Sequence, residues 1–312
     1  MTLTPRLALM LSVPPLLWAG NAVVGRLAIA HIPPLWLNAS RWALALALLL
    51  PLGWRVFASA ARRAEIAARW RPLALLSLTG VGAYNALQYL ALQTSTALNV
   101  TLIAASSPVW AMAIGAAFYG VRPHRAQLLG AGLSLAGVGV VLARGDLAAL
   151  QRVHLVPGDL LMLLAIMSWC VYSWWLARPP PSLRADQRPA WHWSEFLCIQ
   201  IAMGLGWALA GAGMGEWLHP HTAAVQWSPW LVAALAYVAI GPSLIAYRLW
   251  GLGVAEAGPA LATFFGNLTP LFAALLSAAL LGEWPQRYHG LAFALIVAGI
   301  LVSARPDRTR QG

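Results

Sequence analysis

Long apolar stretches separated by short polar loops are the feature that most restricts how this chain of 312 residues can fold. Hydrophobic residues make up 60% of the sequence and charged residues only 9%, and the mean hydropathy is +0.70. Because about 20 apolar helical residues span the hydrocarbon core of a bilayer, each such stretch predicts a membrane-spanning helix. We therefore expect an all-α, polytopic membrane protein.

Ten such stretches predict ten transmembrane helices. They cover residues 7–30, 35–54, 72–92, 97–119, 126–143, 157–177, 193–213, 229–250, 257–281 and 288–304. The first stretch, with Arg6 before it and Ala19-Gly20 inside it, also has features of a cleaved signal peptide. Its apolar run is too long for that, and Trp18-Ala19 has a counterpart in Trp169-Cys170, so we expect it to remain as a helix.

The second half of the chain repeats the helix-disrupting residues of the first half. Ser107-Pro108, Gly120, Pro123 and Ala136-Gly137 recur 162 residues later as Thr269-Pro270, Gly282, Pro285 and Ala298-Gly299, and Gly80 is matched by Pro242. Duplicated hydrophobic halves are typical of transporters. Since five helices per half is an odd number, the two halves must enter the membrane from opposite sides. We expect a first repeat over 1–143, a linker over 144–156, a second, inverted repeat over 157–304 and a basic cytoplasmic tail over 305–312, around a central cavity.

The positive charges predict the orientation of the chain. All twenty basic residues are arginines, and fourteen of them fall in the termini and the loops on one side of the predicted helices. Cytoplasmic loops carry the excess of basic residues, so we expect both termini in the cytoplasm and the protein in a bacterial-type inner membrane. The same distribution argues against a nucleic-acid partner and favours contact with anionic membrane lipid.

Aromatic and amide side chains gather at the predicted midplane. Transporters with inverted repeats bind their substrate there, so we predict substrate-binding roles for these residues. They are Trp18, Asn21, Tyr84, Gln88, Trp110, Trp169, Tyr172, Ser243, Phe264 and Asn267. Aromatic rings can stack on an apolar ligand, while Asn, Gln and Tyr can bind ammonium and carboxylate groups. Each residue, taken alone, is also typical of helix–helix packing.

Three prolines inside apolar stretches are predicted hinge or gating positions: Pro108, Pro242 and Pro270. Arg41 lies deep in the second stretch, where a charge facing lipid is costly, so it should pair inward or extend to the interface. Arg26 and Arg248 lie nearer to helix ends, where reaching the interface is easier. We expect a structural role for each of the three arginines, with recognition of a substrate carboxylate as the alternative.

No Asp or Glu lies at the centre of a predicted stretch. Proton-coupled exporters of cations generally use a buried carboxylate, so its absence favours neutral or zwitterionic substrates and is consistent with uncoupled facilitated diffusion. Cys170 and Cys198 are expected to be packing residues, and His219 and His221 lack the spacing of a metal site. We expect no catalytic residue, no metal and no cofactor.

The stretch Leu17-Trp18-Ala19-Gly20-Asn21, Arg41, the runs 107–120 and 269–283 and the terminal Ala298-Gly299-Ile300 resemble EamA-type members of the drug/metabolite transporter superfamily. Within it, the length, the arginine-only basic content and the aromatic midplane are most similar to the YddG-type aromatic amino acid exporters. One departure is Val121, which stands where the second half has Glu283.

The resemblance implies ten helices in two inverted repeats and export of amino acids, aromatic or otherwise apolar, or of related metabolites by alternating access. Two alternatives remain at this stage. A multidrug or lipophilic-cation exporter would depend on a membrane carboxylate, and a membrane-embedded enzyme would need a reactive cluster at membrane depth. We expect a small-molecule substrate and a monomer, although the sequence does not determine the oligomeric state.

Overall fold

The computed structural model describes residues 3–95, 97–146, 154–184, 187–218, 225–281 and 286–305, and these residues form helices and no strand. The all-helical prediction is thereby confirmed. Gly282, Trp284, Pro285, His219, His221 and the side chain of Arg26 lie outside the described part.

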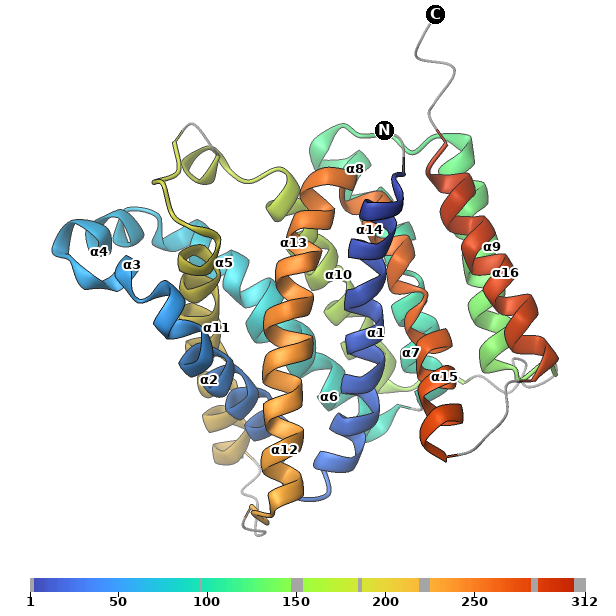
Figure 1. Cartoon of the computed structure of the whole chain (residues 1–312), viewed down its shortest axis with the longest axis horizontal. Coiled ribbons are helices and arrows are strands. Elements are labelled where there is room, and N and C mark those ends of the chain that lie inside the picture. Colours follow the sequence, from blue (N-terminus) through green and yellow to red (C-terminus); the bar gives the residue numbers. More distant parts are fainter. Residues whose placement is uncertain are drawn as a thin grey trace, which may run out of the picture.

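Each apolar stretch of the sequence coincides with one helix or with a run of consecutive helical segments (Figure 1). The segments up to residue 142 are α1 Pro5–Ala28, α2 Pro34–Gly53, α3 Arg55–Ala58, α4 Ala60–Ala67, α5 Trp70–Ser77, η1 Leu78–Ala83, α6 Tyr84–Thr94, α7 Ala97–Ala105, α8 Ser107–Tyr119 and α9 Arg125–Leu142. The remaining segments are α10 Pro157–Ala177, η3 Pro181–Leu183, α11 Trp193–Leu218, α12 Pro229–Val238, η4 Ala239–Ile245, α13 Ala246–Ala257, α14 Pro259–Gly266, α15 Thr269–Leu281 and α16 Arg287–Ser303.

Among the described residues, seven helices are long and apolar enough to cross a membrane. The number rises to eight when α7 and α8, which meet at a bend of 42°, are counted as one span. Helix α16 is apolar but has only 17 residues. The protein is a polytopic membrane protein on these grounds, and ten spans stay a prediction.

Four apolar stretches are interrupted, two of them by π-helical turns. η1 follows α5, and η4 follows α12 and contains Pro242. The other two interruptions separate α7 from α8 at Ser106 and α14 from α15 at Asn267 and Leu268. Since π-helical turns and helix breaks leave backbone carbonyls without their usual helical donor, they can accept hydrogen bonds from other elements.

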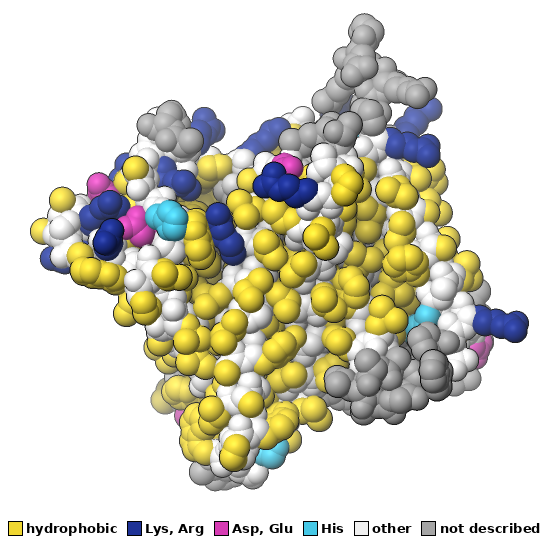
Figure 2. Space-filling model, in the orientation of Figure 1, with side chains coloured by type: hydrophobic (Ala, Val, Ile, Leu, Met, Phe, Trp, Pro, Cys, Tyr) yellow, Lys and Arg dark blue, Asp and Glu magenta, His cyan; other side chains and the backbone are white. Residues whose placement is uncertain are grey.

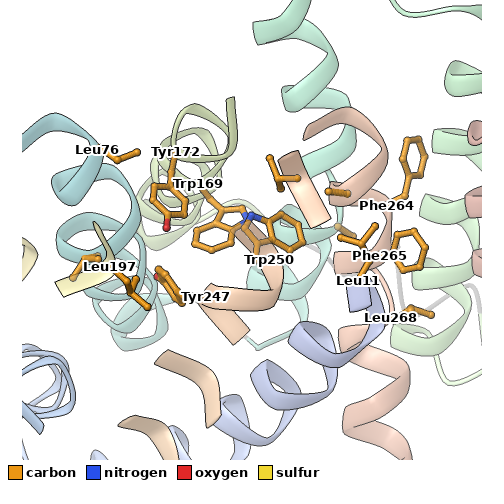
Figure 3. Packing of buried hydrophobic residues seen from close by; sticks show 14 of the residues in the cluster. Leu11, Leu76, Trp169, Tyr172, Leu197, Tyr247, Trp250, Phe264, Phe265 and Leu268 are labelled. Atoms are coloured by element: carbon orange, nitrogen blue, oxygen red, sulfur yellow. The ribbon is translucent and has the colours of Figure 1, made fainter. Parts of the chain in front are cut away.

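The helices pack in a few long contacts around a central core. α9 lies along α16, α2 along α11 and α6 along α10. Gly130 of α9 and Gly299 of α16 allow a close approach of these two helices, because a Cβ atom on either would lie 2.6–2.7 Å from the carbonyl oxygen of the other. Figure 3 shows the core, in which Trp169 of α10 packs beside Trp250 and Tyr247 of α13, with Phe264 and Phe265 of α14 to one side.

The outer surface has the distribution expected of a membrane protein. Hydrophobic side chains cover most of the face shown in Figure 2, and most arginines on this face lie toward the end where α1 begins. Large apolar side chains such as Leu9 and Phe118 are 69% and 80% exposed, an arrangement that lipid tails stabilise and water does not. Trp54 and Trp70, at the two ends of the segment that holds α3 and α4, are about half exposed, as tryptophans at a membrane interface are.

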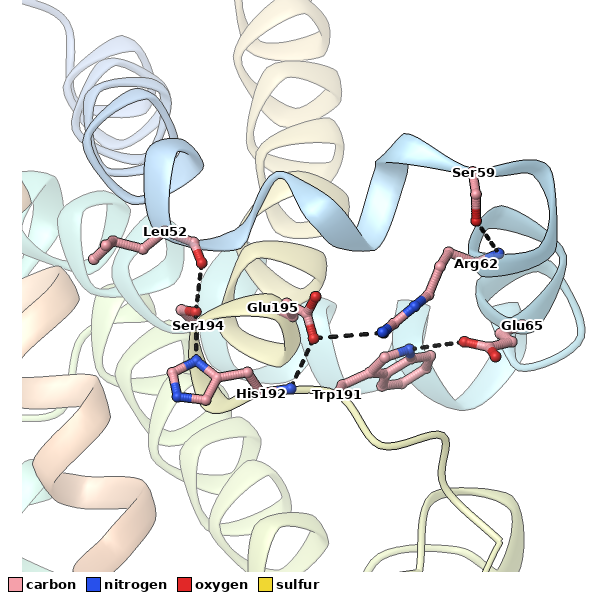
Figure 4. A network of polar contacts seen from close by, with 8 residues as sticks. All are labelled: Leu52, Ser59, Arg62, Glu65, Trp191, His192, Ser194 and Glu195. Carbon is pink, nitrogen blue, oxygen red and sulfur yellow. Dashed lines mark hydrogen bonds and ion pairs between the residues drawn. The ribbon is translucent and has the colours of Figure 1, made fainter.

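A polar network joins this basic segment to the start of α11 (Figure 4). Arg62 of α4 pairs with Glu195 of α11 at 3.5 Å, and Trp191 Nε1 donates to Glu65 at 3.2 Å. Ser194 Oγ donates to the carbonyl of Leu52 at the end of α2. α4 is therefore attached to the start of α11, which is in turn attached to the end of α2.

Candidate functional site

A cavity of about 670 Å³ lies among helices α1, α6, α7, α10, α13, α14 and α15. This is within the range of about 300–1,000 Å³ that is usual for small-molecule sites. Its lining mixes apolar side chains with aromatic and uncharged polar ones. The aromatic and amide residues are Trp18, Asn21, Tyr84, Asn85, Gln88, Tyr89, Trp169, Tyr247, Trp250 and Asn267.

Trp169 is the centre of the aromatic wall. Its ring centroid lies 5.2 Å from those of Trp18 and Tyr84, 5.4 Å from Trp250 and 5.5 Å from Tyr247. The rings come from α1, α6, α10 and α13, so both halves of the chain contribute to the wall. Ring pairs at these distances stabilise one another and present a rigid apolar surface.

Arg41 lies directly behind the polar side of this cavity and is 1% exposed. Its Nη1 donates to Asn85 Oδ1 at 3.0 Å and lies 3.3–3.4 Å from Tyr89 OH and Asn21 Oδ1. Its Nε and Nη2 donate to Ser243 Oγ at 3.0 and 2.8 Å. Of the two arrangements that the sequence allowed, the structure therefore has Arg41 paired inward.

Asn267, at the break between α14 and α15, is also buried and lines the cavity. Its Nδ2 donates to Ser134 Oγ of α9 at 2.8 Å. Its Oδ1 is buried and has no hydrogen-bond partner in the structure. A buried acceptor without a partner is costly, so a ligand that donates a hydrogen bond there would be stabilised.

Six of the ten predicted substrate-binding residues line the cavity. They are Trp18, Asn21, Tyr84, Gln88, Trp169 and Asn267. The other four, Trp110, Tyr172, Ser243 and Phe264, are not part of the lining.

The four remaining residues are placed in the packing around the cavity. Tyr172 lies behind Trp169 and donates to Gln200 Oε1 at 3.1 Å. Ser243 is the acceptor for Arg41. Phe264 is fully buried in the core, and Trp110 packs against the cluster around Ala111 and Ile114.

Several lining residues were missing from the prediction, chiefly Tyr247, Trp250 and Thr263. A π-helical turn accommodates an extra residue, so η4 rotates the helix that follows it and changes which side chains of α13 face inward. On α14 the inward face contains Thr263, Gly266 and Asn267, a spacing of three and four residues that excludes Phe264. This spacing is visible in the sequence, but the depth of a residue in the membrane does not show which face of the helix points into the cavity.

The three predicted hinge prolines all lie at interruptions of helices. Pro242 is inside η4. Pro108 is the second residue of α8, just after the 42° bend, and Pro270 is the second residue of α15 and lines the cavity. Their positions agree with the predicted deformation points, while a role in gating stays a prediction.

Among the residues that the structure describes, the cavity lining contains no Asp, Glu, Lys or Arg. Asp159 at the start of α10 is near it and is bonded to the side chains of Ser95, which lines the cavity, and Asn99. In the part of the chain that the structure describes, no group of three His, Cys, Asp or Glu could hold a metal ion. Such a cavity can enclose a ligand and offer aromatic and hydrogen-bonding surfaces to it.

Comparison with known proteins assigns this fold to a family. The model of the EamA-like transporter family matches the chain twice, over residues 6–143 and 156–305. The chain belongs to the EamA-like transporter family. The resemblance seen in the sequence is confirmed at this level, and general transport follows from it.

Relatives of this EamA-like chain are also described as transporters. It is 27% identical to an uncharacterized transporter of Archaeoglobus fulgidus over 295 residues, which covers 95% of this chain and 96% of the relative. It is 24% identical to the uncharacterized inner membrane transporter YedA of Escherichia coli, covering 92% and 87% of the two chains. One crystal structure superposes with a TM-score of 0.73 at 21% identity, covering 96% and 97% of the chains, which shows a shared fold.

Proposed function

We propose that this EamA-like transporter exports amino acids with aromatic or other apolar side chains, or related small metabolites, across the inner membrane. The observation that carries the proposal is the cavity, which combines a wall of tryptophan and tyrosine rings with uncharged amides and has no acidic residue among its described lining residues. The rings can pack on an apolar side chain and the amides can bind the polar end of an amino acid.

Transport would proceed by alternating access between two inverted five-helix repeats, with the interruptions at Pro108, Pro242 and Pro270 as the points that deform. The double match of the family model, once in each half, supports the duplication. The arginines near the start of α1 and around α4 support an orientation with both termini in the cytoplasm.

An exporter of lipophilic cations is the main competing function, because tryptophan faces also attract cations. Two observations disfavour it here. The described part of the lining contains no carboxylate to neutralise a cation, and Arg41 places a positive charge directly behind the cavity. For the same reason, no carboxylate in the lining is suited to exchange protons for substrate, and uncoupled movement down a gradient is the simplest mechanism.

The test is efflux of labelled amino acids from liposomes that contain only the purified protein. We expect saturable flux of phenylalanine, tryptophan or leucine, and a fall of about tenfold or more when Trp169→Ala removes the central ring of the wall. Trp217→Ala is the matched control, because Trp217 is 76% exposed near the end of α11. Flux of a lipophilic cation without flux of any amino acid would overturn the proposal, and accumulation driven by a pH gradient would overturn the uncoupled mechanism.

A further inference from the structure

Arg41 is a buried positive charge, and no side chain of opposite charge in the described part of the chain neutralises it. It lies in α2, and its five hydrogen bonds all go to uncharged oxygens of Asn21, Asn85, Tyr89 and Ser243. Among the residues that the structure describes, the ion pair found is that of Arg62 with Glu195, at the surface end of α11. Buried charges are normally paired, so an anion that enters the neighbouring cavity would supply the missing countercharge.

The guanidinium also determines which atoms of its neighbours remain for a ligand. A guanidinium has only donors, so the amides of Asn21 and Asn85 must turn their oxygens toward it. An amide nitrogen carries two N–H groups. The Asn85 side chain also hydrogen-bonds the Tyr247 hydroxyl, so the donors left for a ligand are the N–H groups of Asn21 and the remaining N–H of Asn85. Because Asn21, Asn85 and Tyr89 line the cavity, the side of the cavity nearest Arg41 combines amide donors with a positive potential.

A second polar point in the same cavity has the opposite character. The Nδ2 of Asn267 is committed to Ser134, which leaves the buried Oδ1 as an acceptor without a partner. An ammonium group carries only donors and would satisfy this oxygen. The cavity therefore has donors and positive charge beside α2 and an acceptor at the break between α14 and α15.

We infer that the cavity recognises the zwitterionic end of an amino acid, with the carboxylate held by the amide donors in front of Arg41 and the ammonium held by Asn267 Oδ1. This rests on the proposed function and goes beyond it by making a carboxylate obligatory for the substrate. Arg41 is a positioning residue, because its side chain is not part of the cavity lining and acts through Asn21 and Asn85. The aromatic wall then determines which side chains are accepted, and amines without a carboxylate are excluded by the unneutralised charge.

The experiment compares three probes with the same phenyl ring in the full-length protein. Phenylalanine has both charged groups, phenethylamine lacks the carboxylate and 3-phenylpropionate lacks the ammonium. Flux is measured in liposomes, and binding is measured independently as the rise in thermal midpoint of the detergent-solubilised protein. We expect phenylalanine to have the lowest KM, 3-phenylpropionate a KM higher by about tenfold, and phenethylamine no saturable flux and no stabilisation.

Variants distinguish the effect of the Arg41 charge on substrate binding from the effect of the hydrogen bonds made by Asn21 and Asn267. Asn21→Asp keeps the size of the side chain and places a carboxylate beside Arg41, which neutralises its charge, so KM for phenylalanine should rise by about tenfold or more. The uncharged Asn21→Leu should raise this KM less. Asn267→Leu should raise KM for phenylalanine and leave that for 3-phenylpropionate unchanged. Arg41→Gln should abolish the preference for carboxylates, and Arg248→Gln is its control, because Arg248 lies 4.7 Å above the Trp193 ring and outside the cavity lining.

Equal KM values for phenylalanine and phenethylamine, or a carboxylate preference that survives both Arg41→Gln and Asn21→Asp, would overturn the inference. The two measurements also separate it from the proposed function. Carboxylate-dependent thermal stabilisation without any flux would overturn amino acid transport and support the site. Saturable flux with no dependence on the carboxylate would support transport and overturn the inferred site. No flux and no stabilisation by any probe would overturn both.

Discussion

The two π-helical segments, η1 and η4, contain different helix-disrupting residues and are stabilised from different places. In η4, Pro242 has no N–H for the carbonyl of Val238, and Ser243 Oγ of the same segment donates to that carbonyl at 2.7 Å. In η1 there is a glycine at the matching position, Gly80, and no proline. The freed carbonyls of Thr79 and Gly80 accept hydrogen bonds from Ser168 of α10 and Tyr247 of α13.

The difference teaches where the donors to the disrupted carbonyls come from. η4 contains its own donor in Ser243, whose hydroxyl also accepts from Arg41 of α2, whereas the donors to η1 come from other helices. Because the donor in η4 lies one residue away from Pro242, the η4 turn should depend less on the positions of neighbouring helices than η1 does. The η1 turn is held by α10 and α13, so its geometry should follow theirs. A movement of the second half of the chain would thus be transmitted to the first half through η1.

Filling the space at Gly80 should have the largest effect. A Cβ atom there would lie 2.4 Å from the ring of Tyr172, and that ring is itself packed against Trp169. We expect Gly80→Ala to lower the stability by about 1–3 kcal/mol and to abolish most transport. Gly206→Ala is the control, since nothing lies within 4 Å of its Cβ. Equal thermal midpoints for the two variants in detergent would show that η1 tolerates a different packing.

Removing the hydroxyl of Tyr247 tests the remote support of η1 directly. Tyr247 OH donates to the Gly80 carbonyl at 2.5 Å, and Tyr247→Phe leaves that buried carbonyl without this donor. The expected loss is about 1–2 kcal/mol of stability, together with slower transport. Tyr172→Phe is the matched control, because its partner Gln200 is a side chain that also bonds to Phe196. A larger loss in the control would contradict the support assigned to Tyr247.

Replacing Pro242 should change the rate of transport more than the stability. Pro242→Ala restores the N–H that a regular helix would offer to Val238, in competition with the Ser243 hydroxyl. We expect a stability change within about 1 kcal/mol and a several-fold lower maximal rate at unchanged KM. Pro229→Ala, at the start of α12, is the control. Wild-type rates would show that η4 does not deform during transport.

The smallest effect is expected at the contact that joins η4 to α1. Trp18 Nε1 donates to the Pro242 carbonyl at 3.3 Å, which is long for such a bond. Trp18→Phe keeps an aromatic ring and should lower the stability by about 0.5–1 kcal/mol. Thermal unfolding with and without bound phenylalanine separates this loss from any loss of affinity. A loss as large as that of Tyr247→Phe would mean that η4 also depends on remote support.

The helical class, the family and the positions of the interruptions could be predicted from the sequence. Apolar length determines where helices form in a membrane, and Pro or Gly within an apolar stretch marks where they deform. Gly80 and Pro242 were matched in the sequence and both lie in π-helical turns. The family model confirms the EamA resemblance, whereas the YddG-like substrate class stays a prediction.

The composition of the cavity was only partly predictable. Residues in uninterrupted helices, such as Trp18 of α1 and Trp169 of α10, could be placed by depth. Tyr247 and Trp250 follow η4, and the sequence does not show that η4 is π-helical. The hydrogen-bond partners of Arg41 could not be predicted either, because Asn85 and Ser243 lie 44 and 202 residues away from it in the sequence. Such pairings depend on how helices pack, which periodicity alone does not reveal.

The attachment of α4 to α11 has a consequence for how this transporter senses its surroundings. The Arg62–Glu195 pair and the Trp191–Glu65 bond couple a short arginine-rich helix, flanked by the exposed Trp54 and Trp70, to a helix of 26 residues that runs beside α2. Because α4 is bonded to α11, a tilt of α11 would move α4 within the headgroup layer. The lipid composition of that leaflet would then change how easily α11 tilts, and with it the rate of the transport cycle.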